Sequence, residues 1–109
     1  MFARHVTLKL RARSVAELPL VIENKVLPLL RRQKGFRDEI TLVSSERLLA
    51  VGISIWDTKE DADAYNRTEF PEVFKALSEL VEGTPKVETF EVTNSTFSKA
   101  AARSAAETF

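Results

Sequence analysis

Three residues are candidates for exchanging a proton with a ligand or holding a ligand oxygen: Tyr65, Asn94 and His5. Tyr65 could donate its phenolic hydrogen to a ligand while its ring packs, or it could be a core residue with its hydroxyl at the rim. Asn94 could hold a carbonyl or enolate oxygen, or it could bond to the backbone at a strand end. His5 is the only histidine and could act as a general base, although a histidine near the N-terminus is more often a surface or interface residue.

Two aromatic residues, Trp56 and Phe74, could line a ligand pocket. Trp56 ends a predicted strand, where alternation places it on the sheet face that carries no helices. There it could pack against a second copy of the chain or against a ligand. Phe74 falls on the apolar stripe of a predicted helix, which is typical of core packing. The seven phenylalanines could also line an aromatic-binding pocket, although core packing alone would use them.

The composition excludes several kinds of site. Cysteine is absent, which removes disulfides, thiolate nucleophiles and cysteine metal sites. A single histidine excludes metal sites built from several histidines. The sequence has no glycine-rich phosphate loop and no carboxylate pair at a spacing diagnostic of acid–base catalysis. We therefore expect no metal and no cofactor.

The charge balance bears on partners and location. Sixteen basic residues offset sixteen acidic ones, so no overall positive field attracts nucleic acid or an anionic membrane. No apolar run approaches the roughly 18–20 residues of a membrane span. The N-terminal residues lack the basic and apolar regions of a secretion signal. We expect a cytoplasmic protein that binds neither nucleic acid nor membrane.

The apolar periodicity predicts one domain over residues 1–97, followed by a loose tail over 98–109 whose composition lacks an apolar stripe. Ser14 and Glu17 fit a capping box, and Pro28 predicts a kink in the helix that follows. Thr58 fits the N-cap of a second helix. The predicted strands are residues 4–13, 36–44, 48–56 and 86–96, and the predicted helices begin at Ser14, Thr58 and Pro71 and end near residues 34, 67 and 82.

This order of elements is that of the split βαβ, ferredoxin-like α+β fold, with an antiparallel sheet and both helical crossovers on one face. We expect the strongest apolar faces to lie beneath the helices: Val6/Leu8/Leu10, Ile40/Leu42, Val51/Ile53/Ile55 and Phe90/Val92. The opposite face would then carry small, polar and aromatic groups, among them Val43, Gly52, Ser54 and Trp56. Such a face is flat enough for a second sheet or a ligand to cover it.

Two runs of sequence carry a family resemblance: residues 26–36, VLPLLRRQKGF, and residues 55–65, IWDTKEDADAY. In them a helix ends in Gly-Phe, and a strand ending in Trp precedes a short acidic helix. The chain resembles the antibiotic biosynthesis monooxygenase (ABM) domain family of the dimeric α+β barrels over residues 4–96. The resemblance implies a homodimer with its sheets packed face to face, and a cavity between each sheet and its own helices.

The family includes cofactor-free monooxygenases acting on polycyclic phenols, heme-degrading oxygenases and quinone-related enzymes. Heme degraders use an Asn, a Trp and an iron-ligating His, and the corresponding positions here fall on Val6 or His5, on Tyr65, and near Leu77 or Ser78. The iron ligand is missing, so we expect no tight heme binding.

Two functions follow from the resemblance. One is a cofactor-independent monooxygenase or oxidoreductase acting on a small aromatic or quinol-like molecule. The other is a non-catalytic, dimeric ligand-binding or stress-related module. An open cavity holding Tyr65 and a buried polar partner would favour the first, and a collapsed cavity the second.

Overall fold

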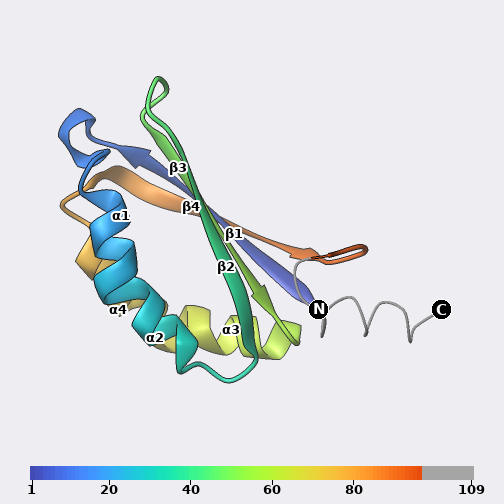
Figure 1. The fold of residues 1–109 in the computed structure, drawn as a ribbon. Coiled ribbons are helices and arrows are strands. Elements are labelled where there is room, and N and C mark those ends of the chain that lie inside the picture. The colour runs from blue at the N-terminus through green and yellow to red at the C-terminus, as the bar shows by residue number, and fades with distance from the viewer. Residues whose placement is uncertain (97–109) are drawn as a thin grey trace.

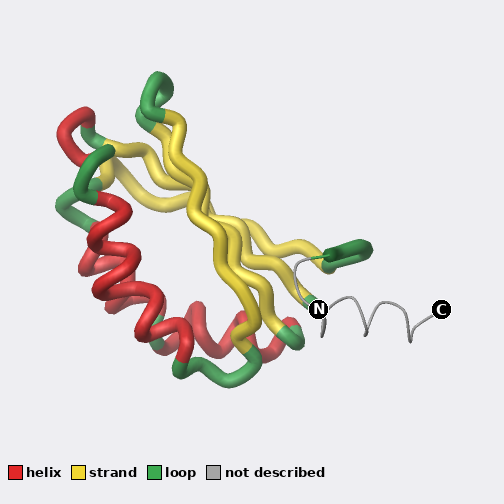
Figure 2. The backbone as a smooth tube through the Cα atoms, in the orientation of Figure 1, coloured by secondary structure: helices red, strands yellow, loops and turns green. Residues whose placement is uncertain are grey.

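The computed structural model describes residues 1–96 as one antiparallel sheet with helices on one side (Figures 1 and 2). The strands are β1 (Phe2–Leu10), β2 (Phe36–Ser44), β3 (Leu49–Trp56) and β4 (Val81–Glu91), in the spatial order β2-β3-β1-β4. This order confirms the ferredoxin-like α+β fold. Within the described part of the chain, no helix is long and apolar enough to cross a membrane. The predicted tail at 98–109 lies outside the described residues.

The first crossover is not the single capped helix that the sequence predicts. A 3₁₀ turn, η1 (Ala12–Ser14), follows β1, and α1 (Leu18–Val21) begins four residues later. The Ser14 hydroxyl is buried without a hydrogen-bond partner, so the predicted capping box does not form. The backbone makes the turn instead, because the Glu17 N–H donates to the Ser14 carbonyl at 3.2 Å.

The predicted irregularity at Pro28 takes the form of a π-helical turn. This turn, η2 (Ile22–Val26), connects α1 to α2 (Leu27–Arg31), where Pro28 stands in the first turn. A proline lacks the N–H that an uninterrupted helix needs, and a first-turn position tolerates that loss. After α2 the chain turns at Gly35, whose φ of +78° favours glycine.

The centre of the chain folds as the sequence predicts. β2 has the predicted bounds, and residues 45–48 form the turn into β3. The N-cap of α3 (Lys59–Thr68) is Thr58, whose hydroxyl accepts a hydrogen bond from the Asp61 N–H at 3.1 Å. α4 (Phe70–Leu77) follows with Pro71 in its first turn.

The prediction for the last helix and strand is wrong at their boundary. α4 ends at Leu77, and β4 begins at Val81, so Gly83 and Pro85 lie inside the strand rather than ending a helix. Gly83 has a φ of +71°, and the pairing with β1 shifts register between Thr7 and Lys9. These residues therefore form an irregularity in an edge strand, where a missing proline N–H costs little.

The assignment of sheet faces is correct for β1 and wrong for β2, β3 and β4, because Phe90 of β4 pairs with Ala3 on the side away from the helices. Val6 pairs with Gly52, and Gly52 pairs with Thr41, so these three residues share the face beneath the helices. We call this the inner face. The large apolar residues of β2, β3 and β4 lie on the opposite, outer face, which we define as Ile40, Leu42, Val51, Ile53, Ile55 and Phe90.

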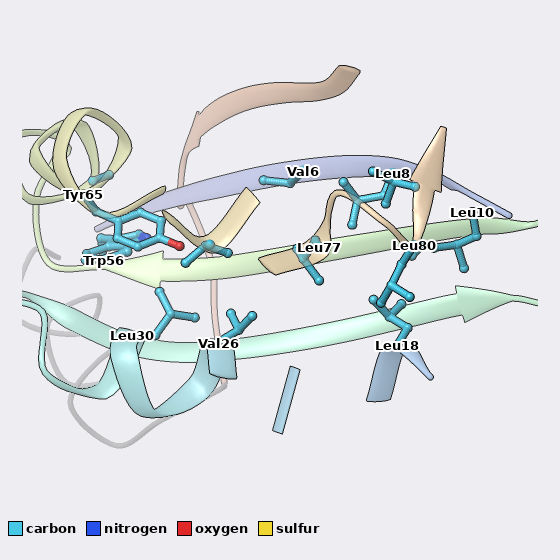
Figure 3. Close-up of a cluster of buried hydrophobic side chains, with 14 residues drawn as sticks. Val6, Leu8, Leu10, Leu18, Val26, Leu30, Trp56, Tyr65, Leu77 and Leu80 are labelled. Carbon is cyan, nitrogen blue, oxygen red and sulfur yellow. The ribbon is translucent and has the colours of Figure 1, made fainter. Parts of the chain in front are cut away.

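The core lies between the inner face and the helices (Figure 3). Leu8, Leu10, Leu18, Leu30 and Leu77 are all buried there. The outer face is different, because Ile40, Leu42 and Phe90 are 43%, 48% and 51% exposed. The helices therefore bury the apolar residues of the inner face, whereas several large apolar residues of the outer face stay exposed.

Candidate functional site

A cavity of about 60 Å³ lies between the inner face and the helices. Since a buried water needs at least about 10–15 Å³ of such space, this cavity has room for several waters or part of a small ligand. Its walls are mostly apolar, formed by β1 and the helical segments. The apolar residues along it are Val6, Leu8, Leu18, Ile22, Val26, Leu30, Ala50, Phe70, Val73 and Leu77.

Polar residues cross the floor of this cavity in one row. Arg4 of β1 pairs with Ser54 of β3, and Ser54 pairs with Glu39 of β2. Residues paired in an antiparallel sheet point to the same face, so the cation, the hydroxyl and the carboxylate all point beneath the helices. The next row contains Thr41 and Gly52, and the missing side chain of Gly52 leaves room in the floor.

Arg4 is the most unusual residue of the site, because a charged side chain only 3% exposed needs partners to offset its desolvation. Its Nη2 donates to the Asn66 side-chain oxygen at 2.7 Å, and its guanidinium lies 4.0 Å from the centre of the Phe70 ring. Its Nε is buried without a hydrogen-bond partner. Burial lowers the pKa of Arg4 and the nearby Tyr65 raises it, and an arginine stays charged throughout. This N–H is therefore left without a hydrogen bond among the described residues.

Tyr65 stands beside this guanidinium. It projects from α3, is 4% exposed, and packs on Trp56 with ring centres 5.0 Å apart. Figure 3 shows its hydroxyl pointing between the sheet and the helices. Burial raises the pKa of Tyr65 to about 12, against the opposing effect of Arg4 at 5.2 Å from its ring. Tyr65 is therefore a protonated hydrogen-bond donor at neutral pH.

Glu39 lies at the β2 end of the row. Its Oε1 accepts a hydrogen bond from the Thr41 hydroxyl at 2.6 Å. Burial raises the pKa of Glu39, while the bond from Thr41 lowers it. A half-buried carboxylate beside an apolar cavity is a proton acceptor that needs little solvent rearrangement.

The structure shows the positions of the two aromatic candidates, Trp56 and Phe74. Trp56 is wholly buried beneath the helices, so its predicted place on the helix-free face is wrong. Its Nε1–H donates to the Ser54 hydroxyl at 2.9 Å, and its ring supports Tyr65. Phe74 stacks on Phe70 with ring centres 6.5 Å apart and packs against the core rather than along the cavity. The core interpretation of Phe74 is the one that the packing supports.

The other two candidates lie away from the cavity. His5 is on the outer face, opposite Ile53, as the alternation predicts, and its ring meets Phe90 edge-on at 6.2 Å. Asn94 follows the end of β4 instead of extending it, so its predicted place at the cavity mouth is wrong. It borders a separate hollow on the outer face with Ala3, Ile53 and Ile55.

Sequence reasoning found Tyr65 and missed Arg4 and Glu39. Arg4 has the same parity as Val6 and Leu8, and that alternation was the available signal for its burial. Glu39 had no comparable signal, because the alternation in β2 favours Ile40 and Leu42, and not Glu39, as the residues beneath the helices. Residues 1–96 contain no group of three or more His, Cys, Asp or Glu side chains able to hold a metal. The cavity offers two donors, one carboxylate and an apolar wall, which suits a planar molecule with oxygen at its edges.

No family model matches the sequence, and no curated protein matches it. Solved structures do match. A protein of unknown function from Nitrosomonas europaea is 16% identical, with 89% of this chain and 93% of that chain covered at a TM-score of 0.74. A monooxygenase from Streptomyces coelicolor, in complex with the ligand Nanaomycin D, is 18% identical, with 90% and 92% covered and a TM-score of 0.72.

A protein from Deinococcus radiodurans, provisionally assigned as an antibiotic biosynthesis monooxygenase, is 18% identical, with 87% and 95% covered and a TM-score of 0.71. The resemblance to ABM proteins is thus confirmed in the fold over nearly the whole described chain. At these identities the likeness concerns the fold, and function has to be argued from the site.

Proposed function

We propose that this chain, which shares its fold with ABM proteins, is a cofactor-independent monooxygenase or related oxidoreductase acting on a small aromatic or quinol-like molecule. The observation that carries the proposal is the buried Arg4, whose Nε–H has no hydrogen-bond partner and whose guanidinium lies 5.2 Å from the centre of the Tyr65 ring, at an apolar cavity that both residues line. Leaving a buried charged donor without a partner costs free energy that a bound oxygen would offset.

In the proposed reaction the substrate supplies the electrons that reduce oxygen. An electron-rich ring reacts with oxygen after it has lost a proton, and its negative charge then concentrates on a ring oxygen. Arg4 and Tyr65 would stabilise that oxyanion, because donors fixed in an apolar site act without solvent rearrangement. The high pKa of Tyr65 keeps its proton available for this hydrogen bond. The Streptomyces coelicolor structure contains the ligand Nanaomycin D, which supports the proposal that the ligand of this chain is a small organic molecule.

Isotope incorporation tests the activity. The protein is incubated under ¹⁸O₂ with a panel of hydroxynaphthalenes and hydroquinones, and the products are analysed by mass spectrometry. We expect one ¹⁸O atom in the product of at least one compound, and loss of incorporation in Arg4→Met and Tyr65→Phe. Arg67→Met, at an exposed arginine of α3, is the control. If compounds of the panel bind tightly and no product contains ¹⁸O, the protein is a non-catalytic ligand-binding protein instead.

We also propose that the protein is a homodimer formed through the outer face. Support comes from the exposure of Ile40, Leu42 and Phe90 on one continuous sheet surface, since soluble monomers rarely expose large apolar patches. A stable interface of this kind commonly buries about 2,000 Å² or more. The cytoplasmic location stays a prediction from the sequence.

The absence of tight heme binding also stays a prediction. Tyr65 could ligate ferric iron only as a tyrosinate, and burial opposes that ionisation. Titration with hemin should therefore give a broad, unsaturable Soret change. A sharp stoichiometric shift that Tyr65→Phe or His5→Ala abolishes would contradict this.

A further inference from the structure

The cavity holds two opposite charges that do not pair with each other. Neither Arg4 nor Glu39 forms a salt bridge within residues 1–96, and the side chain of Glu39 hydrogen-bonds to Thr41 instead. They lie two strands apart in one row, which places their Cα atoms about 10 Å from each other. Ser54 stands between them but is engaged by the Trp56 indole. Two charges held beneath the helices without mutual contact leave the space between them for a ligand.

The carboxylate borders the widest part of the floor. A Cβ placed on Gly52 would meet only Glu39 Oε1, at 3.7 Å, so nothing else fills the space above this glycine. Ala50 in the next row is also small. A flat ring could lie over these residues with one edge toward Glu39 and the other toward Arg4 and Tyr65.

We propose that Glu39 is the proton acceptor of this site, and that its ligand is a conjugated hydroxyaryl compound with a hydroxyl at one edge and a carbonyl-type oxygen at the opposite edge. This inference rests on the proposed function and names its substrate class. The hydroxyl hydrogen-bonds to Glu39, and the distal oxygen accepts hydrogen bonds from the Arg4 Nε–H and the Tyr65 hydroxyl. The ring fills the apolar space between them.

The proton transfer balances within the complex. The ligand O–H bond breaks, the proton goes to a Glu39 oxygen, and the electron pair of that bond enters the conjugated ring. The negative charge then moves to the distal oxygen beside Arg4. The net charge of the cavity does not change, because Glu39 loses one negative charge and the ligand gains one. A ligand without conjugation between its two oxygens would gain no stabilisation from Arg4.

The surroundings of Glu39 contain few competing titratable groups. Of the residues along the cavity, only Arg4 on β1 and Tyr65 on α3 are ionisable besides Glu39. The residues contributed by α1, η2, α2 and α4 are Leu18, Ile22, Val26, Leu30, Phe70, Val73 and Leu77, none of which ionises. Burial, which raises the pKa of Glu39, makes its carboxylate a stronger proton acceptor than an exposed one.

Proton uptake on binding 4-nitrophenol tests the assignment. This probe has a hydroxyl conjugated to a charge-accepting oxygen group, and its phenolate absorbs visible light whereas the neutral phenol does not. Calorimetry in buffers of different ionisation enthalpy counts the protons taken up with each bound probe. The series runs from about pH 6 to about pH 10, below the range in which Tyr65 ionises.

We expect uptake by the natural protein to rise along the series toward one proton per site, because the bound probe and Glu39 share a proton that both lack when free at high pH. Glu39→Gln should bind the phenolate with no uptake. Asp38→Asn, the neighbouring carboxylate on the outer side of β2, should retain the uptake. Thr41→Val should move the uptake to higher pH, because the hydrogen bond from Thr41 lowers the pKa of Glu39 and its loss raises that pKa.

Two results would overturn the inference. One is binding of the probe without proton uptake anywhere in the series. The other is the same uptake in Glu39→Gln as in the natural protein, with Thr41→Val unchanged. In either case, weaker binding by Arg4→Met and Tyr65→Phe would leave the proposed function standing. Failure of 4-nitrophenol to bind at any pH, together with failure of the ¹⁸O panel, would remove both proposals.

Discussion

The two faces of the sheet distribute polarity against the usual pattern. The inner face, covered by helices, carries Arg4, Glu39 and Ser54, whereas the outer face carries Ile40, Leu42 and Phe90. In a single sheet covered on one side, the apolar residues normally lie beneath the cover. Here the covered face carries polar groups along a cavity, and the uncovered face has the composition of a core.

This difference corresponds to the two roles proposed for the sheet, ligand binding on the inner face and pairing of copies on the outer face. The inner face of β3 has Ala50, Gly52 and Ser54, which are small enough to leave a cavity. The outer face of the same strand has Val51, Ile53 and Ile55. Substitutions on the two faces should therefore have different consequences, one set affecting assembly and the other affecting ligand binding.

The largest effect is expected from a charge on the outer face. Leu42→Glu should convert a dimer of twice 12.3 kDa into a monomer, because a carboxylate would be desolvated in an apolar interface. Light scattering at micromolar concentration measures the mass. Leu20→Glu, at a residue of α1 that is 63% exposed, is the control and should leave the mass unchanged. A measured mass of 12.3 kDa for the natural protein in solution would contradict the dimer.

The next effect concerns the inner face. Arg4→Met should weaken binding of 4-nitrophenolate about 10- to 100-fold, since hydrogen bonds from a charged group contribute about 1.5–3 kcal/mol. Its thermal stability should change little, because the substitution also removes a buried donor without a partner. Calorimetry and thermal denaturation measure the two quantities. A large loss of stability with unchanged affinity would show that Arg4 has a structural role only.

A pH titration of Tyr65 measures how strongly the space beneath the helices is shielded from solvent. Tyr65 is the only tyrosine, so the ultraviolet absorbance of tyrosinate reports it directly, and its midpoint should be near pH 12. The unfolded chain ionises this group near its ordinary value of about 10. Its native pKa is raised, so the associated stability is present below pH 10 and is lost as the pH rises toward 12, by roughly 2–3 kcal/mol. Tyr65→Phe should lack that part of the alkaline destabilisation.

The smallest effect is expected at the cavity floor. Gly52→Ala should raise the melting temperature by a few degrees, because replacing a strand glycine contributes roughly 0.5–1 kcal/mol and the new Cβ meets only Glu39 at 3.7 Å. The added methyl group should also weaken probe binding by reducing the cavity. Loss of the dimer in this variant would mean that Gly52 lies on the interface after all.

Much of the fold followed from local signals in the sequence. The alternation in β2 and the Thr58 cap of α3 are determined by neighbouring residues, and both were predicted with the right position. The wrong boundary at Gly83 has a different cause, because the same residues that stop a helix also form a bulge in an edge strand. Pairing with β1 decides between these possibilities, and pairing is a long-range property.

The site was harder to predict than the fold. Assigning faces by hydrophobicity assumed that helices are the only cover available, and this placed Trp56 on the wrong side of the sheet. The burial of Arg4 runs against its hydration, and only its parity with Val6 indicated it. Glu39 reaches the cavity through the register of three strands, which no local pattern reveals.

The edge strand β4 has a consequence for how copies of the chain can join. An exposed strand edge can pair with a strand of another molecule, and repeated strand addition can continue without limit. At Pro85 this edge lacks an N–H, and at Gly83 the backbone departs from regular pairing, so added strands would find an interrupted template. Association through a face under two-fold symmetry is self-limiting, because it uses up the surface that drives it. The irregular β4 edge thus disfavours strand addition. Copies of the chain are then expected to associate through the outer face, which gives finite assemblies and not fibres.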